Sequence, residues 1–289
     1  MASAEVAVST TRAVPERDQH VWIRQLGSEL RLVFGRRRNI AMLAFLAAIP
    51  IFIGIAVKVS PPGGGDGPPF IGQLTSNGLF LAFTALAVCL PVFLPLAVGV
   101  VAGDAVAGEA ATGTLRYLLS IPVSRTRLLV TKSAGVLAYL GAGVLVVTVV
   151  GLVTGALLFG THGVTLLSGD TVSVGNGLVR ATAIAAYVFV DLVGLAAIGL
   201  FFSTLTEVPL GAMAATLVAG IAFAVLDSVP QLGALRELLL THHWLDFGEL
   251  LRRSPDTQSL LRWSLVPLAY TAIFISAAWA RITTADVSG

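Results

Sequence analysis

The amino-acid sequence predicts an all-α integral membrane protein with six transmembrane helices. Apolar residues make up 56% of the 289 residues and charged residues only 12%, against about 25% charged residues in ordinary soluble domains. The apolar residues gather in long runs, each close to the roughly 20 residues that a helix needs to cross the hydrocarbon. The runs do not alternate as the strands of a membrane barrel do, which favours helices. They cover residues 40–59, 79–103, 133–159, 181–203, 208–227 and 263–280.

Before the first run, residues 1–38 are predicted to be a cytoplasmic tail and an amphipathic interfacial helix. Arg24 and Arg31 would reach lipid phosphates while the apolar face of this helix enters the membrane interface. A helix packed on a soluble partner is the alternative. The apolar residues that recur at helical spacing over 20–34 are Trp22, Ile23, Leu26, Leu30, Val33 and Phe34.

The positions of the basic residues predict which loops face the cytoplasm. Seven of the 18 Lys and Arg precede the first run and four more lie between the second and third, whereas loops 60–78 and 160–179 contain none. By the positive-inside rule, the N-terminus and the second connection are cytoplasmic, and six spans return the C-terminus to that side. The Ala-, Val-, Gly- and Arg-rich composition suggests a bacterial protein, so we expect a multi-pass protein of the bacterial plasma membrane.

Residues 39–289 are the predicted six-span domain, and its last connection, residues 228–262, is predicted to be an external helical segment. Leucines and aromatic residues alternate there with charges, over a length too short to cross the membrane twice. One or two short amphipathic helices would rest at the external face or dip into it. The segment contains four arginines, which the positive-inside rule disfavours outside, so a miscounted span is the alternative.

Signatures of catalysis and cofactor binding are missing from the sequence. The fragment closest to a phosphate-binding loop, Thr131-Lys132-Ser133, has threonine where the glycine before the lysine belongs. The single cysteine, Cys89, excludes a cysteine-based metal site. His242 and His243 would point about 100° apart on a helix. We therefore expect a protein that is not an enzyme, holds no cofactor or metal and has no nucleic-acid partner.

Three carboxylates fall in or near the apolar runs, and Asp191 lies closest to the middle of one. A charge near the bilayer centre is costly, so Asp191 must face a partner, a cavity or a subunit interface. Two interpretations stay open: a residue of the substrate pathway or a proton relay, and a structural carboxyl bonded to neighbouring Ser or Thr hydroxyls. Glu207 and Asp227 lie near span ends and are assigned no role.

The most specific stretch of the sequence is the cytoplasmic coupling segment, residues 104–132. Residues 104–121 are predicted to form a short helix that ends at Pro122, which cannot continue it. Glu109 and Arg116 would lie two turns apart on one face of this helix. The basic residues of the next helix oppose its dipole, so lipid phosphates or an acidic partner surface would have to compensate them. These residues are Arg125, Arg127 and Lys132, while Leu115, Leu118 and Leu119 form an apolar knob for a partner's groove.

This segment resembles the permease subunits of type-2 ATP-binding-cassette (ABC) exporters. In that family an acidic residue precedes a Gly-Thr-Leu sequence, and a Leu-rich turn, a Pro-[Val/Ile]-[Ser/Thr]-Arg motif and a basic residue follow. The order of interfacial helix, six spans and external helical segment matches as well, so the resemblance covers essentially the full chain. The matching motif residues are Glu109, Gly113, Thr114, Leu115, Leu118, Leu119, Pro122, Val123, Ser124, Arg125 and Lys132.

The resemblance implies a transport subunit that works with a separate ATPase. ATP and Mg²⁺ would bind to that ATP-binding-cassette subunit, on which residues 104–122 would dock. A second permease subunit, identical or homologous, would complete a pathway for an amphiphilic substrate such as a drug, an antibiotic or a lipid. Two alternatives are a proton-coupled secondary transporter that uses Asp191, and a membrane anchor or regulator of an ATPase that transports nothing.

Overall fold

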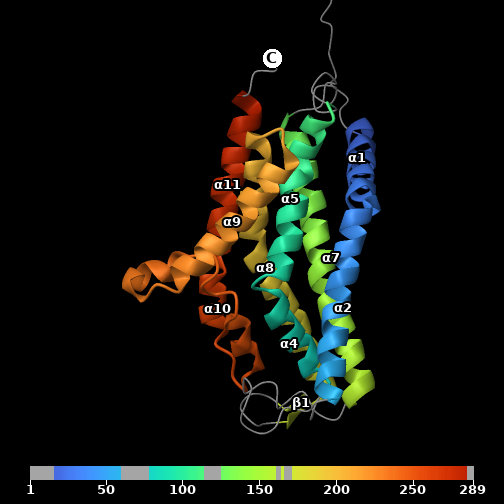
Figure 1. Cartoon of the computed structure of the whole chain (residues 1–289), viewed down its shortest axis with the longest axis vertical. Helices are drawn as coiled ribbons and strands as arrows, with labels where there is room; N and C mark the ends of the chain where they lie inside the picture. Colours follow the sequence, from blue (N-terminus) through green and yellow to red (C-terminus); the bar gives the residue numbers. More distant parts are fainter. Residues whose placement is uncertain (1–15, 60–77, 114–124, 161–163, 166–170, 285–289) are drawn as a thin grey trace, which may run out of the picture.

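Long helices run side by side along the whole length of the molecule (Figure 1). The computed structural model describes residues 16–59, 78–113, 125–160, 164–165 and 171–284. A two-residue antiparallel pairing joins β1 (Val164–Thr165) to β2 (Thr171–Val172). The helices are α1 (Glu16–Gly35), α2 (Arg37–Val59), α4 (Phe80–Cys89), α5 (Phe93–Ala111), α7 (Arg125–Phe159), α8 (Val174–Leu205), α9 (Pro209–Asp227), η1 (Pro230–Leu238), η2 (Asp246–Leu251), α10 (Thr257–Trp263) and α11 (Leu265–Thr284).

Six helical stretches in the described part of the chain are long and apolar enough to span a membrane, which confirms the predicted fold class. α7 and α8 contain 35 and 32 residues, more than the roughly 20 that the hydrocarbon requires. The extra turns of α7 include the polar contacts described below. The six stretches are Arg37–Val59, Phe93–Ala111, Arg125–Phe159, Val174–Leu205, Pro209–Asp227 and Thr257–Thr284.

The second span differs most from the sequence prediction. A single helix over 79–103 is wrong, because the chain leaves helical conformation between α4 and α5, at Val92. Pro91 lies in this break, and a proline inside a helix lacks an N–H donor and clashes with the preceding turn. α4 is almost wholly buried, and α5 continues beyond the predicted run to Ala111. Together the two helices follow the length of the bundle (Figure 1).

The centre of the bundle is formed by α5 and α8. In the most apolar 18-residue stretch of each span, 72% of the residues are buried in α8 and 61% in α5. The buried share is only 17% in α9 and 11% in Thr257–Thr284. One serine joins the two central helices. The Ser203 hydroxyl of α8 donates to the carbonyl of Gly103 at 2.7 Å and accepts from the N–H groups of Val106 and Ala107, both at 2.9 Å. Such polar contacts hold helices together where hydrocarbon surrounds the bundle.

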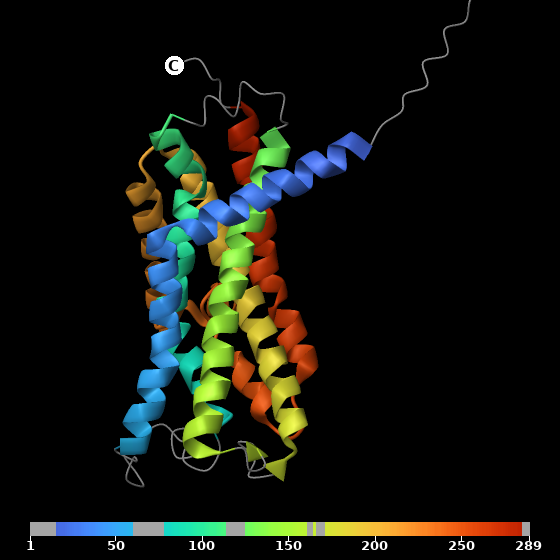
Figure 2. The same ribbon diagram turned by 90° about the vertical axis from the view of Figure 1, so that its right-hand side faces the viewer.

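A helix is present where the sequence predicts one before the first span, namely α1, and it crosses one end of the bundle obliquely, with its N-terminal part projecting beyond the other helices (Figure 2). We refer to this end as the α1 end. Trp22, Arg24 and Arg31 are exposed, whereas Glu29 and Val33 are buried. One side of α1 therefore packs on the bundle, and its placement in the membrane interface stays a prediction. The predicted tail, residues 1–15, lies outside the described residues.

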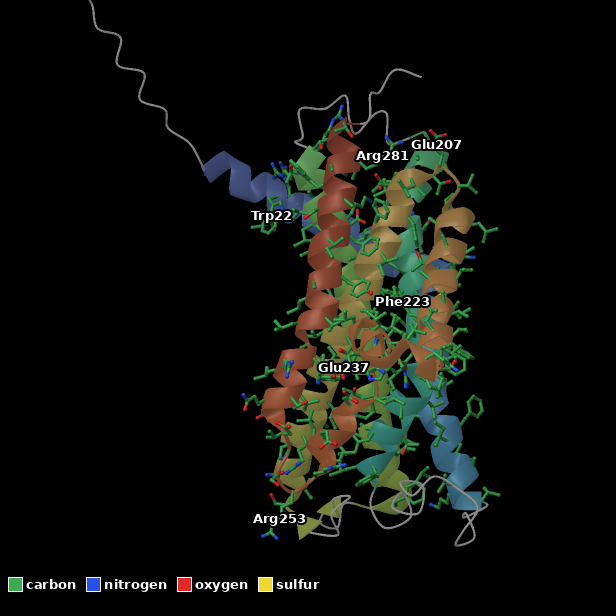
Figure 3. All side chains as sticks on the ribbon, turned by 90° about the vertical axis from the view of Figure 1, so that its left-hand side faces the viewer. Trp22, Glu207, Phe223, Glu237, Arg253 and Arg281 are labelled. Carbon is green, nitrogen blue, oxygen red and sulfur yellow. The ribbon has the colours of Figure 1, made fainter. Side chains whose placement is uncertain are left out.

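The segment 228–262 contains three short helices, η1, η2 and α10, in agreement with the expectation of short helices before the last span. In Figure 3, Glu237 of this segment lies near mid-height, whereas Arg253 lies at the end opposite Arg281. The Arg180 guanidinium at the start of α8 donates to the carbonyls of Leu250 and Arg252. The part of the segment that contains Leu250 and Arg252 is therefore attached to α8, whereas η1 has no buried residue.

Candidate functional site

The coupling segment begins on α5, and the helix there is shorter than the sequence predicts. α5 ends at Ala111, and Gly113 has a φ of 72°, a left-handed conformation that glycine adopts without a steric penalty. A continuous helix over 104–121 is therefore wrong, because α5 ends at Ala111 and Gly113 is not helical. The motif residues that lie outside the described residues are Thr114, Leu115, Arg116, Leu118, Leu119, Pro122, Val123 and Ser124.

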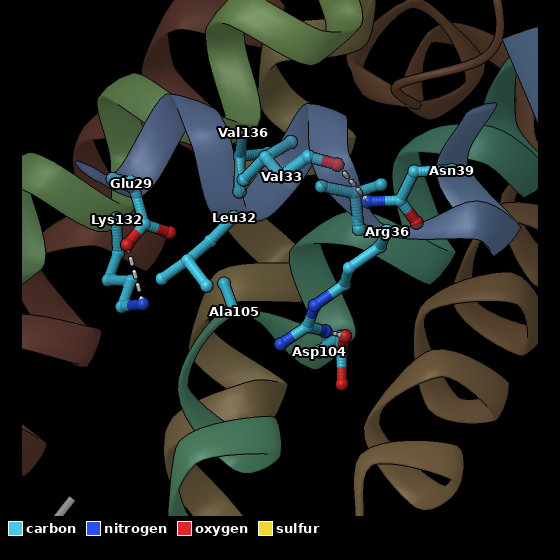
Figure 4. Close-up of a pocket in the computed structure, with 10 residues that line it drawn as sticks. Glu29, Leu32, Val33, Arg36, Asn39, Asp104, Ala105, Lys132 and Val136 are labelled. Atoms are coloured by element: carbon cyan, nitrogen blue, oxygen red, sulfur yellow. Dashed lines mark hydrogen bonds and ion pairs between the residues drawn. The ribbon is translucent and has the colours of Figure 1, made fainter. Parts of the chain in front are cut away.

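Glu109, the first residue of the motif, joins a buried ion-pair cluster with Lys132. The Lys132 ammonium contacts the Glu109 carboxylate and also lies 2.8 Å from Glu29 Oε2. The three side chains are between 5% and 13% exposed. They come from α1, α5 and α7, so one lysine links the oblique helix to two spans. Figure 4 shows the Glu29–Lys132 pair from this cluster.

A second ion-pair cluster lies where α1 meets α2. Asp104 of α5 contacts the Arg36 guanidinium and lies 2.8 Å from Arg38 Nη2. The Asn39 amide donates to the carbonyl of Val33 at 2.7 Å, which fixes the turn between the two helices, and the Tyr139 hydroxyl of α7 donates to the carbonyl of Asn39 at 2.9 Å. Figure 4 shows Arg36 reaching from this turn to Asp104.

The space between the two clusters is too small for a ligand. A cavity of about 20 Å³ is lined by residues of both clusters, which is room for a single water molecule. The six charged residues therefore connect helices and do not form a substrate or nucleotide site. We call them the ionic junction: Glu29, Arg36, Arg38, Asp104, Glu109 and Lys132.

Two basic residues in the first turns of α7, Arg125 and Lys132, have interaction partners within the chain. Arg125 Nη1 donates to the carbonyls of Ile282 at 2.8 Å and Thr283 at 3.0 Å. These carbonyls belong to the last turn of α11, where backbone acceptors lack helical partners and the helix dipole favours a cation. Lys132 is paired within the ionic junction. The expectation that lipid phosphates or a partner must compensate these charges is therefore wrong for Arg125 and Lys132.

Asp191 lies on the face of α8 that is turned to the chain between α9 and α10. One turn before it, the Tyr187 hydroxyl donates to the carbonyl of His243 at 3.0 Å, and just after it Gly194 lies against Leu240. Asp191 is 1% exposed, and its Oδ2 has no hydrogen-bond partner among the described residues. The structural interpretation, a carboxyl held by Ser or Thr hydroxyls, is wrong for this oxygen. A role in a substrate pathway stays a prediction.

The change Asp191→Asn should leave the protein folded, with a melting temperature equal to or above that of the unsubstituted protein. A neutral amide of the same shape avoids the cost of burying a carboxylate. Thermal unfolding of the detergent-solubilised protein, followed by size-exclusion chromatography, measures this. The control is Asp246→Asn, which removes a carboxylate 2.6 Å from His243. A larger loss of stability in Asp191→Asn than in this control would contradict the expectation.

His242 and His243 each have a separate carboxylate partner. His242 Nδ1 lies 2.5 Å from Asp227 Oδ1, and His243 Nδ1 lies 2.6 Å from Asp246 Oδ2. The two rings are nearly perpendicular, and His243 stacks on Trp263. Within the described ranges, His, Cys, Asp and Glu side chains form no group of three that could hold a metal ion. His242 therefore joins the segment 228–262 to the end of α9, and His243 contacts η2 and α10.

Sequence reasoning missed Glu29, which pairs with Lys132, and Asp104, which pairs with Arg36 and Arg38. A signal for Glu29 exists in the sequence, because it lies three residues after Leu26 and four before Val33, on the apolar side of its helix. An acidic residue at such a position needs a buried cation. Asp104 ends the second apolar run and would be assumed to be solvated. Its pairing depends on the turn between α1 and α2, which no sequence pattern indicates.

Comparison with known protein families gives a match over most of the bundle. The family model described as "ABC-2 family transporter protein" matches residues 35–223. This range begins at the turn between α1 and α2 and ends within α9, so it includes every residue of the ionic junction except Glu29. No curated protein matches the chain.

Proposed function

The chain belongs to the ABC-2 family of transporter proteins as a membrane permease component, and on this basis we propose that it serves an exporter driven by a separate ATPase subunit. The observation that carries the proposal is the match over 35–223, which includes the coupling segment and the helices on both sides of it. ATP and Mg²⁺ bind to the partner in this proposal. The α1 end faces the cytoplasm of a bacterium, where the ATPase is located.

The ionic junction supports a route by which the ATPase moves the spans. Residues 114–124 connect α5 to α7, so a partner that binds them acts on both helices. Glu109 and Lys132 join these helices, and Glu29 extends the connection to α1. ATP binding can shift the equilibrium between two states of the pathway only if the ATPase binds one of these states more tightly than the other. A buried junction lets α1, α5 and α7 respond together.

A second permease subunit, identical or homologous, completes the complex. The exposed apolar side chains of α9 support this, because only 17% of its most apolar window is buried within the chain. They are Leu210, Val218, Ile221, Val225 and Leu226. Membrane lipids cover the remaining apolar surface. The substrate that we propose is amphiphilic, namely a drug, an antibiotic or a lipid, since the pathway lies among apolar helices.

Proton-coupled secondary transport through Asp191 is the second candidate function. The observation that favours it is a fully buried carboxylate with an unpaired oxygen among the described residues, since such residues in membranes often mark proton pathways. This candidate predicts flux driven by a pH gradient without ATP and abolished by Asp191→Asn. A regulator of an ATPase that transports nothing would show neither this flux nor ATP-dependent flux.

The substitutions Leu118→Asp and Arg116→Ala in the coupling segment test the proposal. Each change removes contacts with the ATPase, and losing a buried leucine should weaken docking roughly tenfold or more. Transport-coupled ATP turnover in reconstituted vesicles measures the effect. Glu207→Ala is the matched control, because Glu207 is exposed at the same end of the bundle (Figure 3). Normal turnover in folded Leu118→Asp and Arg116→Ala proteins would contradict docking through this segment.

A further inference from the structure

The last span ends in α11, a peripheral helix of the bundle. Only 11% of the most apolar 18-residue stretch of Thr257–Thr284 is buried. α11 packs along α8, where the rings of Phe274 and Phe201 are 5.6 Å apart. On its side toward α7 it borders an apolar groove of about 460 Å³ that residues of α7, α8 and α11 line together. Because this space lies between α11 and α7, apolar packing fixes α11 more firmly against α8 than against α7.

Polar contacts join α11 to α7 at the α1 end. Arg125 Nη1 donates to the carbonyls of Ile282 at 2.8 Å and Thr283 at 3.0 Å. Trp279 Nε1 donates to Thr126 Oγ1 at 2.9 Å. Arg125 and Thr126 are the first two residues of α7, so all three hydrogen bonds connect the beginning of α7 to the last two turns of α11. We call these three bonds the α7–α11 clasp.

The arginine of the clasp supplies what the end of α11 lacks. α11 ends at Thr284, so the carbonyls of its last turn have no N–H groups of a following turn as donors, and the helix dipole makes this end partly negative. A guanidinium provides both hydrogen-bond donors and a positive charge, and such charge-assisted bonds are stronger than neutral ones. Arg125 is therefore a cap for α11 that comes from another helix. In the chain it directly follows residues 114–124, which connect α5 to α7.

We propose that Arg125 and Thr126 hold α11 to the coupling segment, so that the ATPase moves the last span together with α7. This inference rests on the proposed function, because it requires an ATPase that docks on residues 104–122. The ionic junction joins α1, α5 and α7, and the clasp adds α11 through the first turn of α7. In this role Arg125 is a positioning residue that acts through α11.

Spin labels on α11 and between α8 and α9 test the proposal in complexes that contain one labelled permease subunit. Arg281→Cys and Glu207→Cys replace two exposed residues at the α1 end (Figure 3), in a chain whose single cysteine has been replaced in Cys89→Ala. Pulsed electron paramagnetic resonance measures the distance between the two labels with and without ATP and vanadate. We expect this distance to shift on addition of ATP and vanadate, and to stay unchanged when Arg125→Gln and Trp279→Phe are combined.

Transport-coupled ATP turnover in reconstituted vesicles is the second measurement. Losing a charge-assisted hydrogen bond changes an equilibrium by roughly tenfold or more, so we expect Arg125→Gln to lower coupled turnover by roughly tenfold. The ATPase subunit should still copurify with this variant, in contrast to Leu118→Asp, which removes a docking contact. Arg125→Lys keeps the positive charge and should recover part of the turnover.

Arg180→Gln is the matched control, because the Arg180 guanidinium also donates to two carbonyls of another segment, at the start of α8. Both Arg180→Gln and Arg125→Gln should lower the melting temperature, but Arg180→Gln should leave the label shift and the coupled turnover unchanged. If Arg125→Gln fails to fold, Trp279→Phe alone, which loses only the bond to Thr126, should still reduce the label shift.

The outcomes separate this inference from the proposed function. With the ATPase subunit bound, an equal label shift with and without the clasp would overturn the inference alone, and so would the absence of any shift in the unsubstituted complex. A chain that is repeatedly purified without an ATPase subunit would overturn the proposed function, and the inference with it.

Discussion

Replacing Lys132 by methionine is expected to lower the melting temperature of the protein by roughly 10 °C. The change removes the ammonium that lies between Glu29 and Glu109 and leaves two largely buried carboxylates without their shared cation. Breaking a buried ion pair by removing one partner typically costs about 3–5 kcal/mol, and each kcal/mol shifts melting of a protein of this size by about 2–4 °C. Thermal unfolding of the detergent-solubilised protein measures the loss.

Lys58→Met is the control for this substitution, because Lys58 is an exposed lysine at the far end of α2 and exposed charges contribute little. Adding Glu29→Gln and Glu109→Gln to Lys132→Met should recover a large part of the lost stability, since neutral amides replace the unpaired carboxylates. A Lys132→Met protein as stable as Lys58→Met would mean that the junction does not hold α1, α5 and α7 together.

The change Gly103→Ala should sharply reduce the yield of folded protein. A Cβ atom at position 103 of α5 would lie 2.6 Å from the backbone nitrogen of Met213 and 2.9 Å from the carbonyl carbon of Ala212. Backbone atoms cannot rotate away as a side chain can, so α5 and α9 would have to separate. Small residues at such crossings are what allows membrane helices to approach closely, and overpacking costs about 1–3 kcal/mol or more.

The control for this change lies one turn away on the same helix. In Gly99→Ala the new Cβ meets only side-chain atoms, Leu217 Cδ2 at 3.3 Å being the nearest, which can shift. Fluorescence-detected size-exclusion chromatography of tagged proteins compares the two variants. We expect a monodisperse peak for Gly99→Ala and an aggregated or greatly reduced one for Gly103→Ala. Equal peaks for the two variants would show that α5 and α9 do not cross as closely as the structure indicates.

The number of candidate spans and the helix before the first of them could be predicted from the sequence, because the apolar pattern of each helix is local to that helix. The break at Pro91 was missed, since apolar residues continue on both sides and hydropathy does not register a lost N–H donor. The end of α5 was predicted ten residues too late, at residue 121. Gly113 is the residue that allows the chain to leave the helix there, and glycine in a membrane protein is also common inside helices.

The candidate site was predictable only in part. Glu109 and Lys132 belong to the motif of the coupling segment and were identified together, but as neighbours of a partner protein and not of each other. Their contact, and the contribution of Glu29, depend on how α1 packs across α5 and α7. Lys132 lies 23 positions from Glu109 and 103 from Glu29, and local periodicity contains no information on such pairings between different helices. Asp191 stood out for the opposite reason, because a lone charge in an apolar run is visible without any tertiary structure.

Isolation of the tagged chain from its native membranes in a mild detergent, followed by identification of bound proteins and an ATPase assay, tests the proposed function most directly. We expect a stoichiometric subunit with ATP-binding motifs, lost when Leu115, Leu118 and Leu119 are replaced by aspartate and retained in Glu207→Ala. The same isolation will show whether the second permease subunit is identical or homologous. Repeated recovery of the chain alone, without ATPase activity, would contradict an ATP-driven exporter.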